Sequence, residues 1–326
     1  MAPLDTHGRR ISYLRMSVTD LCNLRCRYCM PAEGVPKLSH NEILTFEQML
    51  RIARVAASLG IEKIRITGGE PLVRKNLIHF LTELAAVEGL KELVLTTNGM
   101  LLRKYAHELR SAGVHRLNVS LDSMKADTFS SLTRGGNLEA VLDGIAAAEQ
   151  AGFPPIKINT VVIRGMNDDE LLDFAGMTLQ SHRQIRFIEY MPTTTAPDWS
   201  SAYVSGDDIL RRLRKVYELE AVPRTGSAGP ASLYKIPGAL GTIGVITPIS
   251  NHFCTSCNRI RVTASGVIKG CLFDACGVSL KPYLSGSDEE LRDVLLQVVM
   301  DKPDRHHLSD NTLTQIAPFS MSQIGG

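Results

Sequence analysis

The 326-residue sequence carries little net charge, has no apolar run of membrane-spanning length and contains no cysteine between Cys29 and Cys254. A net charge of +2 is too small to indicate binding to nucleic acid or to a membrane surface. The N-terminal residues lack the charged and then apolar segments of a secretion signal. No apolar stretch reaches the length of a bilayer span. We therefore expect a cytoplasmic protein with neither a nucleic-acid nor a membrane partner.

The cysteines that are present fall into two groups. The first group is Cys22, Cys26 and Cys29, and the second is Cys254, Cys257, Cys271 and Cys276. A secreted disulfide framework would spread an even number of cysteines along the chain, whereas this count is seven. The clustering therefore indicates metal ligation in a reducing compartment.

The first two-thirds of the chain alternates between strand and helix patterns. We predict strands at Ile11–Val18, Glu62–Thr67, Leu93–Thr97, Arg116–Leu121, Ile156–Ile163 and Ile185–Tyr190. A helix is predicted over Thr45–Leu59, with a capping box formed by Thr45 and Gln48 and with Gly60 at its C-terminal end. About six strand–helix units predict an α/β fold in which a parallel sheet is covered by helices.

The composition changes after Val222. Residues 223–230 are rich in glycine, serine and proline, which is typical of a linker or loop. A chain of this length also favours two packed units. We therefore predict one unit over residues 1–222 and a smaller one over residues 223–326, which contains short strands and the second cysteine group.

Polar motifs follow the predicted strands directly. They are Thr67-Gly68-Gly69-Glu70-Pro71, Thr96-Thr97-Asn98-Gly99 and Asn118-Val119-Ser120-Leu121-Asp122. The C-terminal strand edge carries the active site in parallel βα architectures, and the first strand leads into the first cysteine group at that same edge. The glycine pair would let backbone groups approach a ligand closely, although an ordinary tight turn would also explain it.

The first cysteine group has the spacing C-x3-C-x2-C. Three thiolates can hold three irons of a 4Fe–4S cluster and leave one iron open to a ligand. A structural zinc site would need a fourth ligand, and a redox pair would not need a third cysteine. With Tyr28 between the last two cysteines, and with the glycine motif after a strand, this segment resembles the radical S-adenosylmethionine superfamily.

The second group has the spacing Cys254-x2-Cys257-x13-Cys271, and a zinc ribbon that includes Cys276 is the main alternative. The iron–sulfur pattern upstream makes a second cluster the better interpretation. Between Cys257 and Cys271, Arg259 and Arg261 lie on one face of a predicted strand.

Further basic residues occupy predicted strands of the first unit, namely Arg15, Lys63, Arg65 and Lys157. Inward basic residues need an anion, and several of them in one cavity would suit a triphosphate. A solvated basic face is the alternative.

Nearly the whole chain resembles the GTP 3′,8-cyclase family, which begins molybdenum cofactor biosynthesis. The motifs quoted above carry the resemblance, together with Glu189-Tyr190-Met191-Pro192, Asn258-Arg259-Ile260-Arg261 and the Gly-Gly terminus. The resemblance implies an incomplete (β/α)6 barrel with a smaller C-terminal iron–sulfur domain. It further implies two 4Fe–4S clusters and S-adenosylmethionine, whose deoxyadenosyl radical would remove the ribose 3′ hydrogen of GTP before attack on guanine C8 gives 3′,8-cyclo-7,8-dihydro-GTP.

The same resemblance implies roles for individual residues. The clusters would be ligated by Cys22, Cys26 and Cys29, and by Cys254, Cys257 and Cys271, with Cys276 a spare thiol. S-adenosylmethionine would contact Tyr28, Gly69, Ser120, Arg186 and Met191. GTP would contact Arg15, Arg65, Thr96, Lys157, Arg259 and Arg261. Catalysis would involve Arg15, Arg65, Gly325 and Gly326.

The implied partners are an external one-electron reductant and cyclic pyranopterin monophosphate synthase, which would receive the product. The sequence leaves the oligomeric state open, a homodimer included. Two other functions fit parts of the pattern, namely a peptide-modifying radical enzyme with an auxiliary cluster and a non-catalytic metal-binding redox sensor. The basic residues favour the nucleotide over a peptide.

The resemblance implies that the tail reaches the active site, where two residues without side chains could pass through a narrow channel. Adding residues after Gly326 is therefore expected to abolish turnover while leaving the iron content unchanged. Assays of GTP consumption alongside iron analysis would check this, and full activity in the extended protein would contradict it.

Overall fold

The computed structural model describes residues 2–36, 38–39, 41–192, 199–223, 229–274, 277–306 and 321. Within these residues the strands form one sheet in the order β12-β11-β10-β1-β2-β3-β4-β5-β6-β9-β8-β7. The strands are β1 (Tyr13–Ser17), β2 (Lys63–Thr67), β3 (Glu92–Thr97), β4 (Arg116–Ser120), β5 (Lys157–Val162), β6 (Gln184–Glu189), β7 (Glu220–Val222), β8 (Ser232–Lys235), β9 (Thr242–Ile246), β10 (Arg259–Val262), β11 (Val267–Lys269) and β12 (Val278–Ser279).

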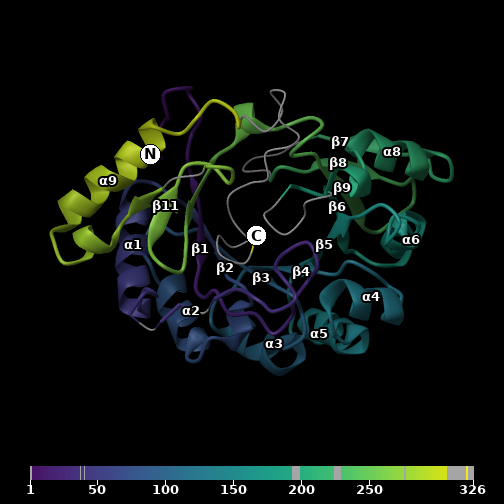
Figure 1. Ribbon diagram of the computed structural model, residues 1–326, viewed down its shortest axis with the longest axis horizontal. Coiled ribbons are helices and arrows are strands. Elements are labelled where there is room, and N and C mark those ends of the chain that lie inside the picture. Colours follow the sequence, from purple (N-terminus) through teal and green to yellow (C-terminus); the bar gives the residue numbers. More distant parts are fainter. Residues whose placement is uncertain are drawn as a thin grey trace.

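Strands β1 to β6 pair in parallel with their sequence neighbours and curve around the centre of the molecule (Figure 1). Strand β10 adds in parallel to β1, and β9 adds in parallel to β6. The outermost pairs on both sides are antiparallel. The six predicted strands are confirmed, with ends that differ by at most two residues. The arrangement is an α/β fold with an incomplete barrel.

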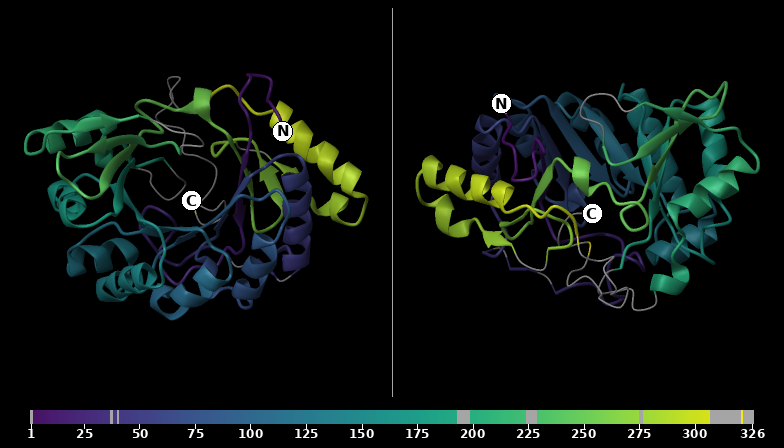
Figure 2. Two further views of the ribbon diagram at one scale, coloured as in Figure 1. Left: turned by 180° about the vertical axis from the view of Figure 1, so that it is seen from behind. Right: turned by 90° about the horizontal axis from the view of Figure 1, so that it is seen from above.

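The helices lie on the outside of the curved sheet (Figures 1 and 2). They are α1 (Phe46–Ser58), α2 (Leu77–Ala85), α3 (Leu102–Ser111), α4 (Ala126–Thr133), α5 (Leu138–Gln150), α6 (Leu171–Gln180), α7 (Trp199–Ala202), α8 (Gly206–Arg214) and α9 (Asp288–Met300). Short 3-10 turns cover Pro71–Val73, Cys254–Ser256 and Lys281–Leu284. None of the described helices combines the length and the apolar character needed to cross a membrane.

Helix α1 begins where the sequence predicts. The side chain of Thr45 accepts from the backbone of Gln48, and the side chain of Gln48 accepts from the backbone of Thr45, so that both members of the capping box are present. Gly60 has a φ of +93°, which a residue with a side chain rarely adopts, and it follows the last helical turn. The helix is thus delimited by local chemistry at both ends.

The alternation of side chains along each strand separates an apolar layer from a polar interior. Outward residues such as Leu14, Ile64 and Leu95 are fully buried between the sheet and the helices. Their neighbours along the strands point inward and are mostly charged or polar, with Arg15 aligned beside Arg65 and beside Arg261. The helices therefore cover the apolar face, and the charged face lines the inside of the barrel.

The predicted boundary at residues 222 and 223 does not interrupt the sheet. Strand β9 pairs with β6, and strand β10 pairs with β1 at the opposite side of the curved sheet. The C-terminal segment is thus hydrogen-bonded to both sides of the first unit. The division into two domains stays a prediction.

Candidate active site

One cavity of about 800 Å³ occupies the inside of the barrel. Its wall contains every described residue to which the sequence analysis assigned a site role. These are Arg15, Cys22, Cys26, Tyr28, Cys29, Arg65, Gly69, Thr96, Ser120, Lys157, Arg186, Met191, Cys254, Cys257, Arg259, Arg261 and Cys271. Gly325, Gly326 and Cys276 lie outside the described residues.

The first cysteine group follows β1 in a compact loop at the C-terminal strand edge. The backbone N–H groups of Cys29 and Met30 both donate to the carbonyl oxygen of Cys26, at 2.9 and 3.1 Å, which turns the chain back on itself. Burial, together with the neighbouring Cys29, raises the pKa of Cys26 well above its usual value. The thiols are therefore close enough to repel one another when ionised, and a bound cation would relieve that repulsion.

The glycine motif after β2 packs directly on this loop. The N–H of Gly69 donates to the carbonyl oxygen of Thr19 at 2.7 Å, and that of Glu70 donates to Leu21 at 2.8 Å. A methyl group added at Gly69 would lie 2.3 Å from the Leu21 carbonyl oxygen, and one at Gly68 would lie 2.8 Å from that of Thr19. The glycines are therefore required by the contact between two loops, whatever ligand they also approach.

Glu70 connects the glycine motif to the next strand end. Its buried carboxylate accepts from the Thr97 hydroxyl at 2.8 Å, from the Asn98 backbone at 2.7 Å and from the Leu72 backbone at 3.1 Å. Burial raises the pKa of Glu70 to about 7 in spite of these donors. The Asn98 side chain in turn reaches Asn23 at 2.8 Å, so the carboxylate fixes the loop beside the first cysteine group.

Tyr28 is held by the end of β4. Its hydroxyl donates to Asp122 Oδ2 at 2.7 Å, and Asp122 Oδ1 accepts from the Val161 backbone at 2.9 Å. Burial raises the pKa of Asp122 to about 6. The ring between the second and third cysteines is therefore fixed by a carboxylate from the opposite part of the strand edge, a residue that the sequence analysis noted only as part of a motif.

The second cysteine group lies at the other end of the strands. Cys257 precedes β10, and β10 runs parallel to β1 with Arg259 beside Tyr13, whereas Cys22 follows the end of β1. Strand β11 runs back antiparallel and leads to Cys271 near the same edge. Since β1 has five residues, and a strand rises about 3.3 Å per residue, the two groups are separated by roughly 15 Å along the cavity.

The donor sets fit iron–sulfur clusters better than single ions. No disulfide joins the described cysteines. Among the described residues, no three His, Cys, Asp or Glu side chains converge closely enough to ligate one metal ion, as a zinc site requires. A cubane cluster is held by thiolates bound to separate irons, so its thiols need not converge on one point.

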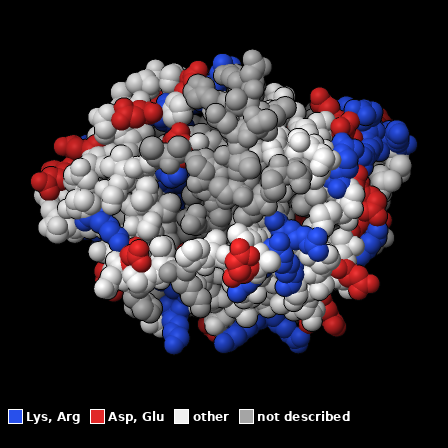
Figure 3. All heavy atoms as spheres, in the orientation of Figure 1, with Lys and Arg blue, Asp and Glu red and all other residues white. Residues whose placement is uncertain are grey.

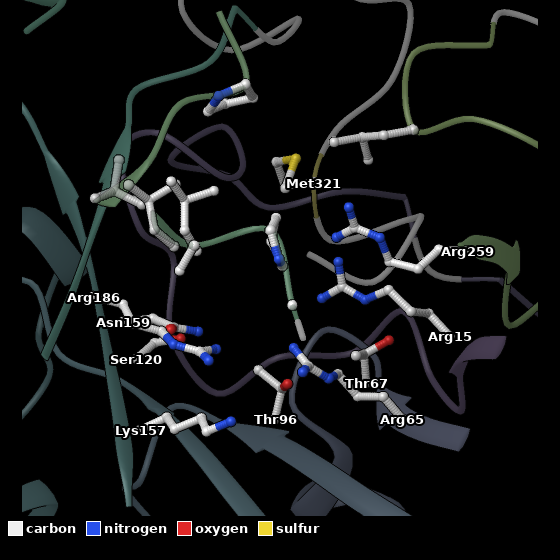
Figure 4. Close-up of a pocket in the computed structure, with 18 of the residues that line it drawn as sticks. Arg15, Arg65, Thr67, Thr96, Ser120, Lys157, Asn159, Arg186, Arg259 and Met321 are labelled. Carbon is white, nitrogen blue, oxygen red and sulfur yellow. The ribbon is translucent and has the colours of Figure 1, made fainter. Parts of the chain in front are cut away.

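Basic side chains dominate the middle of the cavity. In Figure 4, Arg15, Arg65 and Arg259 extend from one wall, while Lys157 and Arg186 lie on the opposite side. Burial and the charges of Arg186, Arg116 and other neighbours lower the pKa of Lys157 to about 6.

Three cavity arginines also have lowered pKa values. Burial and Arg65 lower the pKa of Arg186 to about 9, and burial and Arg259 lower that of Arg261 to about 10. The pKa of Arg15 is lowered well below its usual range by burial and by Arg261. An anion placed among these groups would reverse each shift.

Several other buried polar atoms in the described part of the cavity wall form no hydrogen bond. Among the described residues, the Tyr13 hydroxyl, Arg65 Nε, Thr96 Oγ1 and Asn159 Oδ1 are buried without a hydrogen bond. Arg65 Nη1 does reach Asn118 at 2.7 Å when the Asn118 amide oxygen faces it. Buried polar groups are nearly always satisfied in folded proteins, so this wall is suited to a polar ligand.

The outer surface has a different charge distribution. Figure 3 shows basic and acidic side chains interspersed over the face viewed, with basic ones gathered near α8. Helix α8 ends with Arg211, Arg212 and Arg214. Arg211 and Arg212 have carboxylate partners at Asp208 and Asp168. The net charge of the whole chain is therefore small, although basic side chains are concentrated inside the barrel.

Sequence reasoning missed several residues of the wall. Tyr13, Arg116 and Asn159 lie on the inner rows of β1, β4 and β5, and could have been found by counting every second residue from Arg15, Ser120 and Lys157. Glu92 forms ion pairs with Lys63 at 2.5 Å and with Arg116 at 2.8 Å. Lys302 comes from beyond α9, and no local pattern marks it.

Comparison with known proteins agrees with this geometry. Residues 16–177 match the family model of the Radical SAM superfamily, and residues 183–308 match that of Molybdenum Cofactor Synthesis C. The chain is therefore a radical S-adenosylmethionine enzyme with 4Fe–4S and S-adenosylmethionine cofactors. A curated protein of Geobacter sulfurreducens named GTP 3′,8-cyclase is 57% identical over all of both chains, and one of Moorella thermoacetica is 48% identical over 99% of each. The chain belongs to the GTP 3′,8-cyclase family.

Solved structures support the fold. Streptococcus suis SuiB bound to S-adenosylmethionine superposes with a TM-score of 0.63 and 16% identity, covering 91% of this chain and 68% of that one. Methylornithine synthase superposes with a TM-score of 0.50 and 15% identity over 64% of each chain. At these identities the likeness concerns the barrel architecture alone.

The contact between the glycine motif and the cysteine loop gives a prediction. Gly69→Ala would force the loop away from β2, so we expect reconstituted iron to fall from about eight to about four per chain. Iron and sulfide analysis measures this. Gly176→Ala in α6 is the control, because its methyl group would come no closer than 3.5 Å to Tyr217. A full iron content in Gly69→Ala would show that the loop contact is dispensable.

Proposed function

We propose that this chain converts GTP to 3′,8-cyclo-7,8-dihydro-GTP, the first step of molybdenum cofactor biosynthesis, within the cavity described above. The observation that carries the proposal is a barrel interior lined by buried basic side chains, whose positive charges disfavour one another, between two groups of three thiols. A bound triphosphate would supply negative charge to balance these side chains. The reaction itself is inferred from membership of the family.

We assign one cluster to each cysteine group. Cys22, Cys26 and Cys29 would hold the cluster that binds S-adenosylmethionine, beside Tyr28, Gly69, Ser120 and Met191. When bound, this pair supplies the radical that removes the ribose 3′ hydrogen. Cys254, Cys257 and Cys271 would hold the second cluster, whose open iron anchors the purine. The role of the chain is to fix both ligand sets at opposite ends of one cavity and to exclude water between them.

The cations between the clusters would bind GTP. Arg15, Arg65, Thr96, Lys157, Arg259 and Arg261 carry over from the family motifs. Arg186 was assigned to S-adenosylmethionine by the same resemblance, but its neighbours are Lys157 and Arg65, which supports a contact with the phosphates. The guanidinium groups suit phosphate oxygens because each offers two parallel donors.

Other parts of the assignment rest on the family. The product would pass to cyclic pyranopterin monophosphate synthase, and an external reductant would supply one electron per cycle. Cluster thiols that must stay reduced support a cytoplasmic location. A homodimer, the domain division at residue 222 and the action of Gly325 and Gly326 are further proposals.

Anaerobic incubation tests the function directly. Reconstituted protein should contain about eight irons per chain and, with S-adenosylmethionine and a reductant, should form deoxyadenosine only when GTP is present. GTP should be consumed and a cyclised nucleotide should accumulate. A peptide panel is the parallel arm, because a peptide-modifying enzyme shares the same fold and cofactors.

Three results would refute the assignment. They are deoxyadenosine formation that does not depend on GTP, turnover with a peptide and not with GTP, or zinc as the sole metal. Arg261→Met provides an internal check, since it should weaken GTP binding while leaving about eight irons per chain.

Lys157 gives a prediction on proton uptake. Burial and the charges of Arg186 and Arg116 lower the pKa of its amine to about 6, so the amine is mostly neutral at pH 7.5. A triphosphate beside it favours the charged form, so GTP binding at pH 7.5 should take up close to one proton. This uptake should fall to about half a proton near pH 6 and disappear well below that pH. Calorimetry in two buffers of different ionisation enthalpy measures the uptake. Lys157→Met should abolish it, and equal uptake in that variant would contradict the assignment.

A further inference from the structure

The loop before β1 contains a buried ion pair that has no part in the reaction as described. Arg9 Nε lies 2.5 Å from Asp5 Oδ2, and the two residues are 7% and 5% exposed. Asp5 Oδ1 also accepts from the backbone of His7 at 3.0 Å and from that of Arg9 at 2.8 Å. The carboxylate therefore both shapes the loop and orients the guanidinium.

Arg9 uses all of its side-chain donors. Besides Nε on Asp5, its two Nη atoms donate to four backbone carbonyl oxygens, those of Cys254 at 2.9 Å, Asp304 at 2.9 Å, Pro303 at 2.6 Å and Lys302 at 3.3 Å. A guanidinium has five N–H groups in a rigid fork, and here each has an acceptor. Arg9 thus joins the N-terminal loop, the turn at the second cysteine group and the chain that follows α9.

Lys302 extends this connection to the third cysteine of the group. Its buried ammonium donates to the carbonyl oxygen of Gly270, the residue before Cys271. Since Arg9 binds the Lys302 carbonyl, the backbone positions of Cys254 and Cys271 depend on one set of contacts.

We propose that Arg9 is a positioning residue for the second cluster. Through the Cys254 carbonyl and the segment 302–304, it holds Cys254 and Cys271 at the separation that a cubane requires. The inference rests on the assignment of Cys254, Cys257 and Cys271 as ligands. Charge alone does not account for the arrangement, because a lysine would supply the charge with only three donors for five acceptors.

Arg51 offers a matched control. It donates to Asp288 Oδ1 at 2.7 Å and to the carbonyl oxygens of Leu284 and Gly286, each at 2.6 Å. These contacts join α1 to the segment before α9, and none of the joined segments carries a cysteine. Arg51 therefore stabilises the fold by the same chemistry without reaching either ligand set.

The test compares Arg9→Gln, Arg9→Lys and Arg51→Gln with a reference in which Cys254, Cys257 and Cys271 are all replaced by serine. Each protein is reconstituted anaerobically, and iron, sulfide and the electron paramagnetic resonance spectrum after reduction are measured. We expect about four irons in Arg9→Gln, with the spectrum of the reference protein and with S-adenosylmethionine binding retained. Arg9→Lys should recover little of the lost iron, and Arg51→Gln should keep about eight.

Several results would overturn the proposal. Both clusters retained in Arg9→Gln, full recovery in Arg9→Lys, or equal loss of the second cluster in Arg51→Gln would each do so. If Arg9→Gln does not fold, the same iron counts are measured for Arg9→Lys and Asp5→Asn. Two clusters in both of these variants would refute the positioning role of Arg9. About eight irons in the triple-serine reference would instead disprove the ligand assignment, and the inference would fall with it.

Discussion

The excess of positive charge on the inner face of the sheet is the constraint on which the rest of the structure depends. In a barrel, every second residue of each strand points inward, and these positions usually form an apolar packed centre. Here they include Arg15, Arg65, Lys157, Arg186 and Arg261. Burial and neighbouring positive charges lower the pKa values of Arg15, Lys157, Arg186 and Arg261. Because these like charges disfavour one another, the inward side chains do not pack together as an apolar core would, and the interior remains a cavity. A bound polyanion would stabilise the fold as well as occupy the site.

The loops at the C-terminal strand edge form a connected layer over this charged interior. Glu70 joins the ends of β2 and β3, Gly69 brings that junction against the cysteine loop, and Asp122 fixes Tyr28 from β4. Each connection uses a buried polar group whose hydrogen bonds are made by backbone or hydroxyl donors. The reactive thiols are therefore placed by neighbouring loops that are themselves placed by strands, which suits a site where small displacements cost rate.

Much of this arrangement could be predicted, because it is encoded locally. Strand ends, the Thr45 capping box and the inner row of β2 follow from alternation and from side-chain chemistry within a few residues. The glycine pair was predicted for its approach to a ligand, but its closest contacts are with Thr19 and Leu21. The role of Arg9 could not be predicted, because its carbonyl acceptors lie more than two hundred residues away, at Cys254 and beyond. No pattern around Arg259 reveals that its strand pairs with β1, so the edge occupied by the second cysteine group was also hidden.

The parallel pairing of β1 with β10 has a consequence for selectivity. The first cysteine group follows β1, whereas Cys254 and Cys257 precede β10 and Cys271 follows the antiparallel β11. The length of the strand pair therefore sets how far apart the two groups lie. Backbone hydrogen bonds along the pair keep this length from changing when ligands arrive. The barrel thus fixes the distance between the two cysteine groups. A molecule that must touch both ends is selected by its length before any individual contact discriminates among its atoms.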